Sequence, residues 1–492
     1  MLYPSLKEFL KLAKSANLIP VYKEINADLD TPVSAFLKIA QSDYSFLLES
    51  VEGQEKIARF SFLGANPSLI FKSKGRHVEI IQPKKKSRVK FTAQTNPLDE
   101  IKKIMSGFKP ARVTGLPLFY GGLVGYMGYD TVRFFEEIPD KNPDELKVPD
   151  MLFMLTDTIL VFDRVNHTIK IVSNVILPAR ASQKQKIKAY RQALKDIETI
   201  EKDFNRTITE SNLKPNTAKP VKVDSNCKKL EFQAMVKKAK AYIKAGDIIQ
   251  VVLSQRFRAK INKSPFDIYR QLRSINPSPY MFFLKLKDFF LVGSSPEILV
   301  RCENGLVTTR PIAGTRKRGA SQTQDLRLEQ ELLNDEKEKA EHIMLVDLGR
   351  NDLGRVCKTS SIQVSEFMSV ERYSHVMHLV TEVQGKIRQD KDIFDVLSAS
   401  FPAGTVSGSP KIRAMEIIDE LENTRRGTYA GCVGYFSFSG NMDTCITIRT
   451  ILIKDNFAYV QAGAGLVADS QPQKEYFETV NKAKALMEAI TK

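Results

Sequence analysis

Short runs in which hydrophobic and polar side chains alternate recur through the first third of the chain, and this pattern is typical of half-buried strands. The runs predicted as strands are Ser45–Glu49, Ala58–Leu63, Leu118–Gly125 and Ile159–Phe162. A helix is predicted over Thr31–Gln41, because Thr31 is a favourable N-cap and Pro32 suits the first helical position. Strands therefore dominate residues 1–175.

The pattern changes after this segment. A polar helix is predicted from Ala181 to Phe204, and a linker rich in Ser, Asn, Thr, Lys and Pro follows it. An amphipathic helix over Lys228–Ala245, ended by Gly246, and a strand over Asp247–Lys260 come next. The chain thus divides into an N-terminal segment (1–175), a helix and linker (176–227) and a C-terminal segment (228–492).

The C-terminal segment contains strands in runs. Residues 279–310 read as antiparallel strands around the turns Lys-Asp and Glu-Asn-Gly, and residues 430–463 repeat that style around Ser-Gly-Asn-Met and Lys-Asp-Asn. Two helical blocks, 322–348 and 410–424, lie between them. Because strands and helices do not strictly alternate, we predict an α+β fold with large antiparallel sheets.

Composition excludes several classes of protein. Hydrophobic residues make up 42% of the 492 residues and charged residues 27%, which is ordinary for a globular protein and excludes a disordered or collagen-like chain. The five cysteines form no close-spaced pair, so a disulfide framework is not expected. This pattern fits a protein of the reducing cytoplasm. No signal peptide and no membrane-spanning run is found.

The net charge of +17 (74 basic minus 57 acidic side chains) allows a partner such as nucleic acid only if the excess is clustered. The densest cluster is Lys72–Lys90, with eight basic residues and a single acid, Glu79. Its alternating pattern and turn residues predict a surface hairpin with a solvated basic loop, and no nucleic-acid-binding motif accompanies it. A polyanion-binding function remains an alternative hypothesis at this point, although we do not expect a nucleic acid as the partner.

Paired carboxylates carry the clearest chemical signal. Glu338 and Glu341 are three residues apart in a predicted helix, and Glu475 and Glu478 repeat the spacing near the C-terminus. Residues at that spacing share a helix face, and two such faces offer the oxygen ligands that Mg²⁺ takes. Solvated surface helices would have the same pattern. An apolar turn follows Glu341 directly, which favours an acidic face that enters the core.

Two glycine-rich stretches could approach a ligand. Residues 401–411 lead into a helix for which Ser409 is the predicted N-cap, and such a helix start suits a carboxylate or phosphate. Residues 461–465 are predicted to form a bare loop after a strand. Arg449, in a predicted strand over residues 447–450, could bind a carboxylate with two hydrogen bonds or could simply face solvent. His378 and His375 could equally be a structural pair.

Several long motifs in a fixed order resemble the chorismate-utilising enzymes over 228–490, and their anthranilate synthase large-subunit branch above all. The motifs are RPIAGTR from Arg310, EHIMLVDLGRND from Glu341, FPAGTVSGSPKIRAMEIIDELE from Phe401 and RRGTYAGCVGYFSF from Arg425. The N-terminal LLES and RFSFLGANP also match. The alternative function is that of the sister aminodeoxychorismate synthases, which typically have Lys at the position of Ala313. Isochorismate and salicylate synthases typically have Lys at the position of Gln250.

The resemblance implies a fold and a reaction. The fold is a four-layer α/β/β/α sandwich in which the N-terminal and C-terminal segments are interwoven. The reaction converts chorismate and ammonia to anthranilate and pyruvate, as the first committed step of tryptophan biosynthesis. Mg²⁺ would be bound by Glu338, Glu341, Glu475 and Glu478, and the substrate-binding residues would be Gln250, Gly314, Thr315, Tyr429, Arg449, Gly463 and Gly465.

It also implies catalytic and regulatory residues. Glu297 matches the general acid, and His378 and Thr405 are candidates for the aromatisation step. Tryptophan would inhibit through a site in the N-terminal segment and its neighbours, at Glu49, Ser50, Pro277, Tyr280 and Met281. No glutaminase motif is found, so a separate glutaminase subunit is expected, in a heterotetramer of two synthase and two glutaminase subunits.

Overall fold

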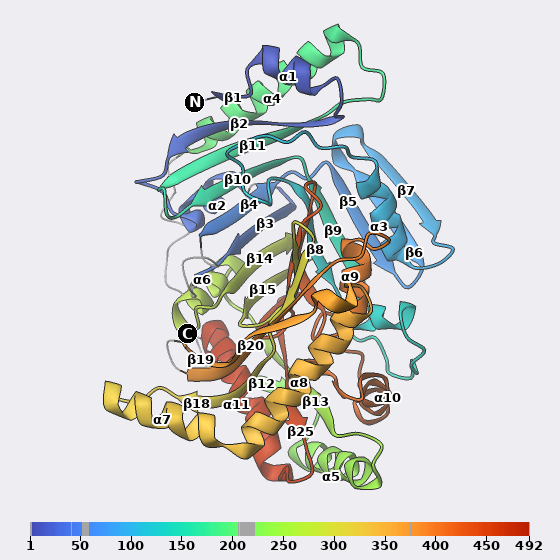
Figure 1. The fold of residues 1–492 in the computed structure, drawn as a ribbon, viewed down its shortest axis with the longest axis vertical. Coiled ribbons are helices and arrows are strands. Elements are labelled where there is room, and N and C mark those ends of the chain that lie inside the picture. Colours follow the sequence, from blue (N-terminus) through green and yellow to red (C-terminus); the bar gives the residue numbers. More distant parts are fainter. Residues whose placement is uncertain are drawn as a thin grey trace.

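Two large antiparallel sheets, of 13 and 12 strands, pack face to face with helices on their outer faces (Figure 1). The computed structural model describes residues 2–40, 42–51, 59–204, 206, 222–373 and 376–491. His375, residues 207–221 of the predicted linker, and the residues Gln41 and Ala58 at the ends of two predicted elements lie outside the described residues. The predicted α+β sandwich is confirmed.

The first sheet combines strands from both ends of the chain. Its order is β1 (Leu2–Tyr3), β2 (Leu18–Asn26), β11 (Thr168–Ile176), β10 (Thr158–Asp163), β4 (Phe60–Ala65), β3 (Tyr44–Glu49), β14 (Tyr280–Leu286), β15 (Phe289–Ser295), β24 (Thr450–Lys454), β25 (Phe457–Leu466), β13 (Gln250–Lys260) and β12 (Val223–Ser225). A short strand, β21 (Gly408–Ser409), also pairs with β13.

The second sheet is built in the same way. Its order is β18 (Ile312–Lys317), β20 (Val376–Lys386), β17 (Leu306–Thr309), β16 (Ile298–Glu303), β23 (Met442–Ile446), β22 (Cys432–Ser437), β8 (Gly122–Met127), β9 (Met151–Thr156), β5 (Leu69–Lys74), β6 (His77–Gln82) and β7 (Ser87–Thr92), with β19 (Gln363–Arg372) pairing with β20. The N-terminal segment joins the C-terminal one where β3 pairs with β14 and β8 pairs with β22.

Helices cover both outer faces. Those packed on the first sheet are α1 (Leu6–Leu12), α2 (Pro32–Ile39), α4 (Gln183–Phe204), α6 (Pro265–Ile275) and α11 (Pro472–Thr491). Those on the second are α3 (Pro97–Ser106), α8 (Glu336–Gly354) and α9 (Ile393–Ser400). Helices α5 (Lys229–Ala245) and α10 (Lys411–Leu421) pack beside β13, and α7 (Gln322–Asn334) lies against β18 and β20.

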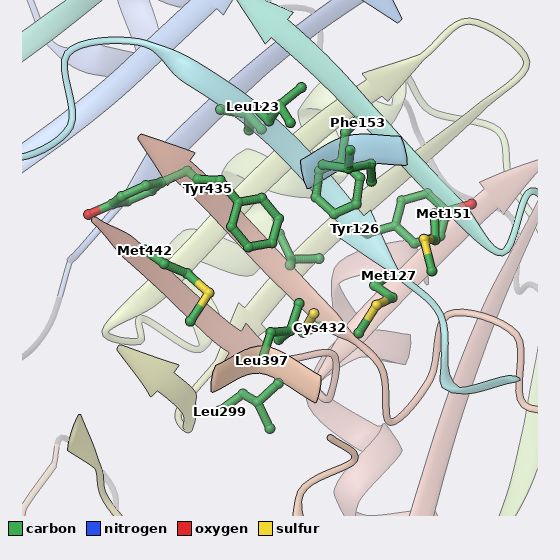
Figure 2. Close-up of a cluster of buried hydrophobic side chains, with 14 of the residues drawn as sticks. Leu123, Tyr126, Met127, Met151, Phe153, Leu299, Leu397, Cys432, Tyr435 and Met442 are labelled. Carbon is green, nitrogen blue, oxygen red and sulfur yellow. The ribbon is translucent and has the colours of Figure 1, made fainter. Parts of the chain in front are cut away.

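The core between the sheets is apolar and holds no disulfide. Figure 2 shows both faces of the second sheet: Phe153 of β9 and Cys432 of β22 lie on the side covered by Leu397 of α9, whereas Tyr126 of β8 faces the first sheet, where it contacts Phe289 of β15. All five cysteines are buried free thiols, as expected. No helix in the described residues is both long and apolar enough to span a bilayer.

Local sequence signals were accurate where caps and turns determine the ends of elements. Thr31 caps α2 and Gly246 ends α5 with φ of 85°. The block predicted at 322–348 is instead two helices, because Asp335 accepts hydrogen bonds from the backbone N–H groups of Lys337 and Glu338 and so starts α8. The basic stretch forms β5–β7 with Lys84 and Lys85 in the connecting turn, which confirms the predicted hairpin.

Candidate functional site

The candidate active site lies where α8 and α11 approach the ends of β13, β16 and β25, in the lower half of Figure 1. Glu297 stands at its centre, just before β16, and is only 8% exposed. The hydroxyl of Thr405 donates to Glu297 Oε2 over 3.4 Å. Burial raises the pKa of Glu297 to about 7, against the opposing effects of Lys482, Thr405 and Arg449. The side chain can therefore hold a proton near neutral pH.

Arg449 is close to Glu297 but is not the strand residue that was predicted. It lies in the bend between β23 and β24 with φ of 48°, a left-handed conformation that is uncommon for a side chain of this size. Its Nη1 donates to the carbonyl of Lys482 over 3.2 Å. The prediction of a strand failed because the bend turns the chain from one sheet to the other, which no local pattern encodes.

Lys482 is a site residue that the sequence analysis missed. Its ammonium lies 2.7 Å from Glu478 Oε1 and donates to the carbonyl of Gly463 over 3.2 Å. It also acts electrostatically on the carboxyls of Glu297, Glu341 and Glu475, where its charge partly offsets the rise in pKa that burial causes. Its place four residues after Glu478, on the same helix face, was the available signal.

The glycines at 463 and 465 lie inside β25 and not in a loop, so that prediction was wrong. A Cβ at Gly463 would lie 2.7 Å from the hydroxyl of Tyr429, and one at Gly465 would lie 2.9 Å from Nε2 of Gln250. The strand therefore needs glycine because two site side chains approach its backbone closely. Pairing of β25 with β13 keeps these residues extended.

Gln250 has one engaged and one free polar atom. Its Nε2 donates to Glu341 Oε1 over 2.9 Å, whereas its buried Oε1 has no hydrogen-bond partner among the described residues. The residue is 3% exposed. Since buried polar groups are nearly always paired, the free acceptor indicates a ligand with an N–H or O–H group.

His378 forms a separate part of the site with β18. Its Nδ1 lies 2.9 Å from the carbonyl of Gly314 and 3.1 Å from the hydroxyl of Thr315. Burial lowers the pKa of His378, so the ring is neutral at physiological pH. An Nδ1–H donated to the carbonyl leaves Nε2 as the basic nitrogen.

The four predicted metal ligands come from two helices, as expected, but each faces a cation or a donor of this chain. Glu338 Oε1 is 3.2 Å from Arg316 Nη1, and Glu341 and Glu478 are bonded to Gln250 and Lys482. Glu475 is hydrogen-bonded to the side chain of Ser470. Within the described ranges no three acidic, His or Cys side chains form a group that could hold a metal. The donor chemistry still fits Mg²⁺, since burial and the neighbouring carboxylates raise the pKa values of Glu341 and Glu475.

The turn before α10 also differs from the prediction. Pro410 is the N-cap of α10 and no side chain caps the helix, so the assignment of Ser409 as the N-cap was wrong. Ser409 pairs with Gln250 in β21, and its carbonyl accepts from Ile249 N over 2.8 Å. Strand pairing takes this residue because β13 has a free edge there. The turn thus brings Thr405 beside the strand that carries Gln250.

A second cavity, of about 550 Å³ with its open mouth, lies between the two sheets. Glu49, Ser50, Tyr280 and Met281 line it, together with Pro279; Pro277 is not among its lining residues. The hydroxyl of Ser50 is buried and has no partner within the described part of the chain. The cavity therefore brings together four of the five residues predicted for a regulatory site and offers one free polar group.

Comparisons with known proteins show the family of this chain. A family model described as chorismate binding enzyme matches residues 45–488. Anthranilate synthase component 1 of Acetivibrio thermocellus is 52% identical, over 100% of this chain and 99% of its own length.

Solved structures extend the likeness to the fold. The crystal structure of anthranilate synthase component I from Streptococcus pneumoniae TIGR4 superposes with a TM-score of 0.76 at 39% identity, covering 94% of this chain and 98% of that one. The menaquinone-specific isochorismate synthase of Escherichia coli shares the fold alone, with a TM-score of 0.69 at 18% identity over 99% of this chain and 98% of that one. The chain therefore belongs to the chorismate-binding enzyme family, in its anthranilate synthase component 1 branch.

Proposed function

We propose that this chain converts chorismate and ammonia to anthranilate, pyruvate and water. The observation that carries the proposal is the buried carboxyl of Glu297, with a pKa raised to about 7, beside the cations Arg449 and Lys482. A carboxyl that keeps its proton near neutral pH is suited to expel a hydroxyl group, and two cations beside it are suited to an anionic substrate.

The binding groups are assigned by charge and position. Arg449 and the hydroxyl of Tyr429, with the backbone at Gly463 and Gly465, would hold the enolpyruvyl carboxylate of chorismate. Gly314 and Thr315 would lie against the ring beside His378. The ring carboxylate would be held on Mg²⁺ by Glu341 and Glu478, assisted by Glu338 and Glu475. The bound Mg²⁺ would supply positive charge that anchors this carboxylate and draws electrons from the ring.

The chemistry balances with the groups present. Ammonia forms a bond to C2 with its lone pair, both ring double bonds shift, the C4 hydroxyl leaves as water after Glu297 gives it a proton, and the added nitrogen releases one proton. Oε1 of Gln250 would accept an N–H of ammonia and so orient its lone pair. Loss of the C2 proton to a base and departure of the enolpyruvyl group as pyruvate then restore the aromatic ring. Neutral His378 is our candidate for that base. The hydroxyl of Thr405 would orient Glu297.

Ammonia would come from a glutaminase partner subunit, and the assembly would be a heterotetramer of two subunits of each kind in the cytoplasm. The second cavity would bind tryptophan as a feedback inhibitor, with the hydroxyl of Ser50 as a free ligand group. The carboxylate of Glu49 is already bonded to Tyr269, Arg273 and Arg164. We therefore propose that Glu49 maintains the shape of the cavity and does not bind tryptophan directly. An aminodeoxychorismate synthase is disfavoured because Ala313 stands where that branch typically has Lys.

The test is an assay of the purified chain with chorismate and Mg²⁺. Anthranilate, identified by fluorescence and mass, is expected with ammonium salts but not with glutamine. Formation of aminodeoxychorismate, or of no product, would overturn the proposal. Glutamine-driven activity without a partner would overturn the proposed division of labour. Because the chain contains no Trp, binding of tryptophan can be followed through the ligand's own fluorescence.

A further inference from the structure

Arg426 is a buried cation that the reaction above does not use. It lies between α10 and β22 and is 2% exposed. Its guanidinium binds Glu422 with two hydrogen bonds, of 2.9 Å from Nε to Oε2 and 2.7 Å from Nη2 to Oε1. Burying a charged group costs free energy, which its hydrogen-bond partners must offset. The partners of Arg426 therefore indicate which parts of the structure it holds together.

The remaining donors of Arg426 reach two backbone carbonyls near site residues. Nη1 donates to the carbonyl of Val406 over 2.6 Å, and Nη2 donates to that of Val252 over 2.6 Å. Val406 directly follows Thr405, whose hydroxyl contacts Glu297. Val252 is two residues after Gln250 in β13, so its carbonyl lies in the same strand.

The plane of the guanidinium also meets two aromatic rings. Its central carbon is 4.8 Å from the ring centroid of Tyr129 and 5.4 Å from that of Tyr429. Tyr429 carries the hydroxyl that lies against Gly463. One guanidinium therefore contacts three separate segments, each of which carries a candidate site residue.

Glu422 completes the network. Its Oε1 accepts from both the backbone N–H and the hydroxyl of Ser254, over 2.8 and 2.7 Å. The carboxylate and the guanidinium are thus satisfied without solvent. Only a planar fork with several fixed donors can make this set of contacts, which a lysine ammonium cannot reproduce.

We propose that the Arg426–Glu422 pair is a positioning element that holds Thr405, Gln250 and Tyr429 in their working arrangement. The proposal rests on the proposed function only in the reaction used to test it. Arg426 itself touches no reacting atom and acts through these three residues. Small displacements of such groups are costly, since misplacement by about 1 Å can lower a rate on the order of 10²-fold.

The test compares Arg426→Lys with Arg133→Lys in the chorismate and ammonium assay. Arg133 is a matched control, because it also pairs with a buried carboxylate (Nη2 to Asp419 Oδ1, 2.7 Å) and donates to a carbonyl (Nε to Pro139 O, 2.9 Å). Its other partners are Asp130 and Asp140; Asp130 accepts from the backbone N–H of Gly427, which is not a candidate site residue. For Arg426→Lys we expect kcat to fall on the order of 10²-fold, with a smaller rise in KM for chorismate. For Arg133→Lys we expect a lowered melting temperature and an unchanged kcat.

Chemical rescue separates positioning from folding. Arg426→Ala should recover activity when millimolar guanidinium is added, and methylammonium should not replace it. If Arg426→Ala does not fold, Glu422→Gln loosens the same fork and should lower kcat while the chain stays folded. The proposal would be overturned if folded Arg426→Lys kept the wild-type kcat. It would also be overturned if Arg426→Lys and Arg133→Lys lost kcat to the same extent. A wild-type chain that forms no anthranilate would instead overturn the proposed function.

Discussion

Two buried glutamates, Glu297 and Glu49, have different surroundings, and the difference fits the chemical role proposed for the first and a structural role for the second. Glu297 is 8% exposed and receives one long hydrogen bond, of 3.4 Å from Thr405. Glu49 is 3% exposed and receives bonds from Tyr269 (2.5 Å), Arg273 (3.1 Å) and Arg164 (3.0 Å). Glu49 is the last residue of β3 and Glu297 lies between β15 and β16, and each lines a cavity.

The difference lies in how much of the cost of burial is offset. Glu49 has two cations and a hydroxyl hydrogen-bonded to its carboxylate, so both carboxylate oxygens have partners. Glu297 has its cations at longer range, so burial dominates and the pKa rises to about 7. A buried carboxyl with few hydrogen-bond partners can exchange a proton. A carboxylate whose oxygens are all hydrogen-bonded instead connects the chain segments that supply its partners.

The largest expected effect is on catalysis by Glu297→Gln. The amide keeps the shape and the contact with Thr405 but cannot donate the proton, so kcat should fall about 10²- to 10⁴-fold with little change in melting temperature. The readout is anthranilate fluorescence, with thermal unfolding in parallel. Glu303→Gln, at the far end of β16, the strand that follows Glu297, is the control and should keep kcat. Near-normal kcat in Glu297→Gln would remove the contrast between the two glutamates.

Glu49→Gln should act on stability. Removing one partner of a buried ionic cluster leaves Arg273 and Arg164 without their shared carboxylate, which typically costs about 3–5 kcal/mol. Urea unfolding of the purified chain measures this loss. Asp347→Asn breaks the exposed pair with Arg350 and should cost less than about 1 kcal/mol. Equal stability of the two variants would contradict the structural role of Glu49.

The pH dependence of kcat/KM tests the protonation of Glu297. The acid must carry its proton, so activity is present below its pKa and is lost as the pH rises through about 7, approaching tenfold per pH unit above it. The profile has to be measured at a constant concentration of free ammonia. A flat profile from pH 6 to 9 would show that Glu297 is not the acid.

Thr405→Val should give the smallest effect and sharpen the comparison. The hydrogen bond from Thr405 lowers the pKa of Glu297, so its removal should move the alkaline limb to higher pH. A preference of about 1 kcal/mol of this bond for the ionised carboxylate over the neutral carboxyl corresponds to roughly 0.7 of a pH unit. Thr444→Val, whose hydroxyl donates to the carbonyl of Val300, is the control and should leave the limb in place. A shift to lower pH would contradict the assigned role.

Much of the site could be predicted from the sequence where the information is local. The spacing of Glu338 and Glu341 placed them on one helix, and Thr31 and Gly246 placed helix ends, because such signals act within a turn or two of backbone. Predictions failed at Arg449, at Ser409 and at Gly463. Each of these residues takes its conformation from a strand or side chain that is distant in the sequence.

The sequence by itself determined which elements form, which carboxylates share a helix face, and the motifs that place the chain in its family. Tertiary structure alone decided the protonation of Glu297, the saturation of Glu49 and the position of Lys482 beside Gly463. The physical reason is that desolvation and charge pairing depend on groups that folding brings together from distant parts of the chain. A glutamate therefore becomes an acid or an anchor only when its neighbours are in place.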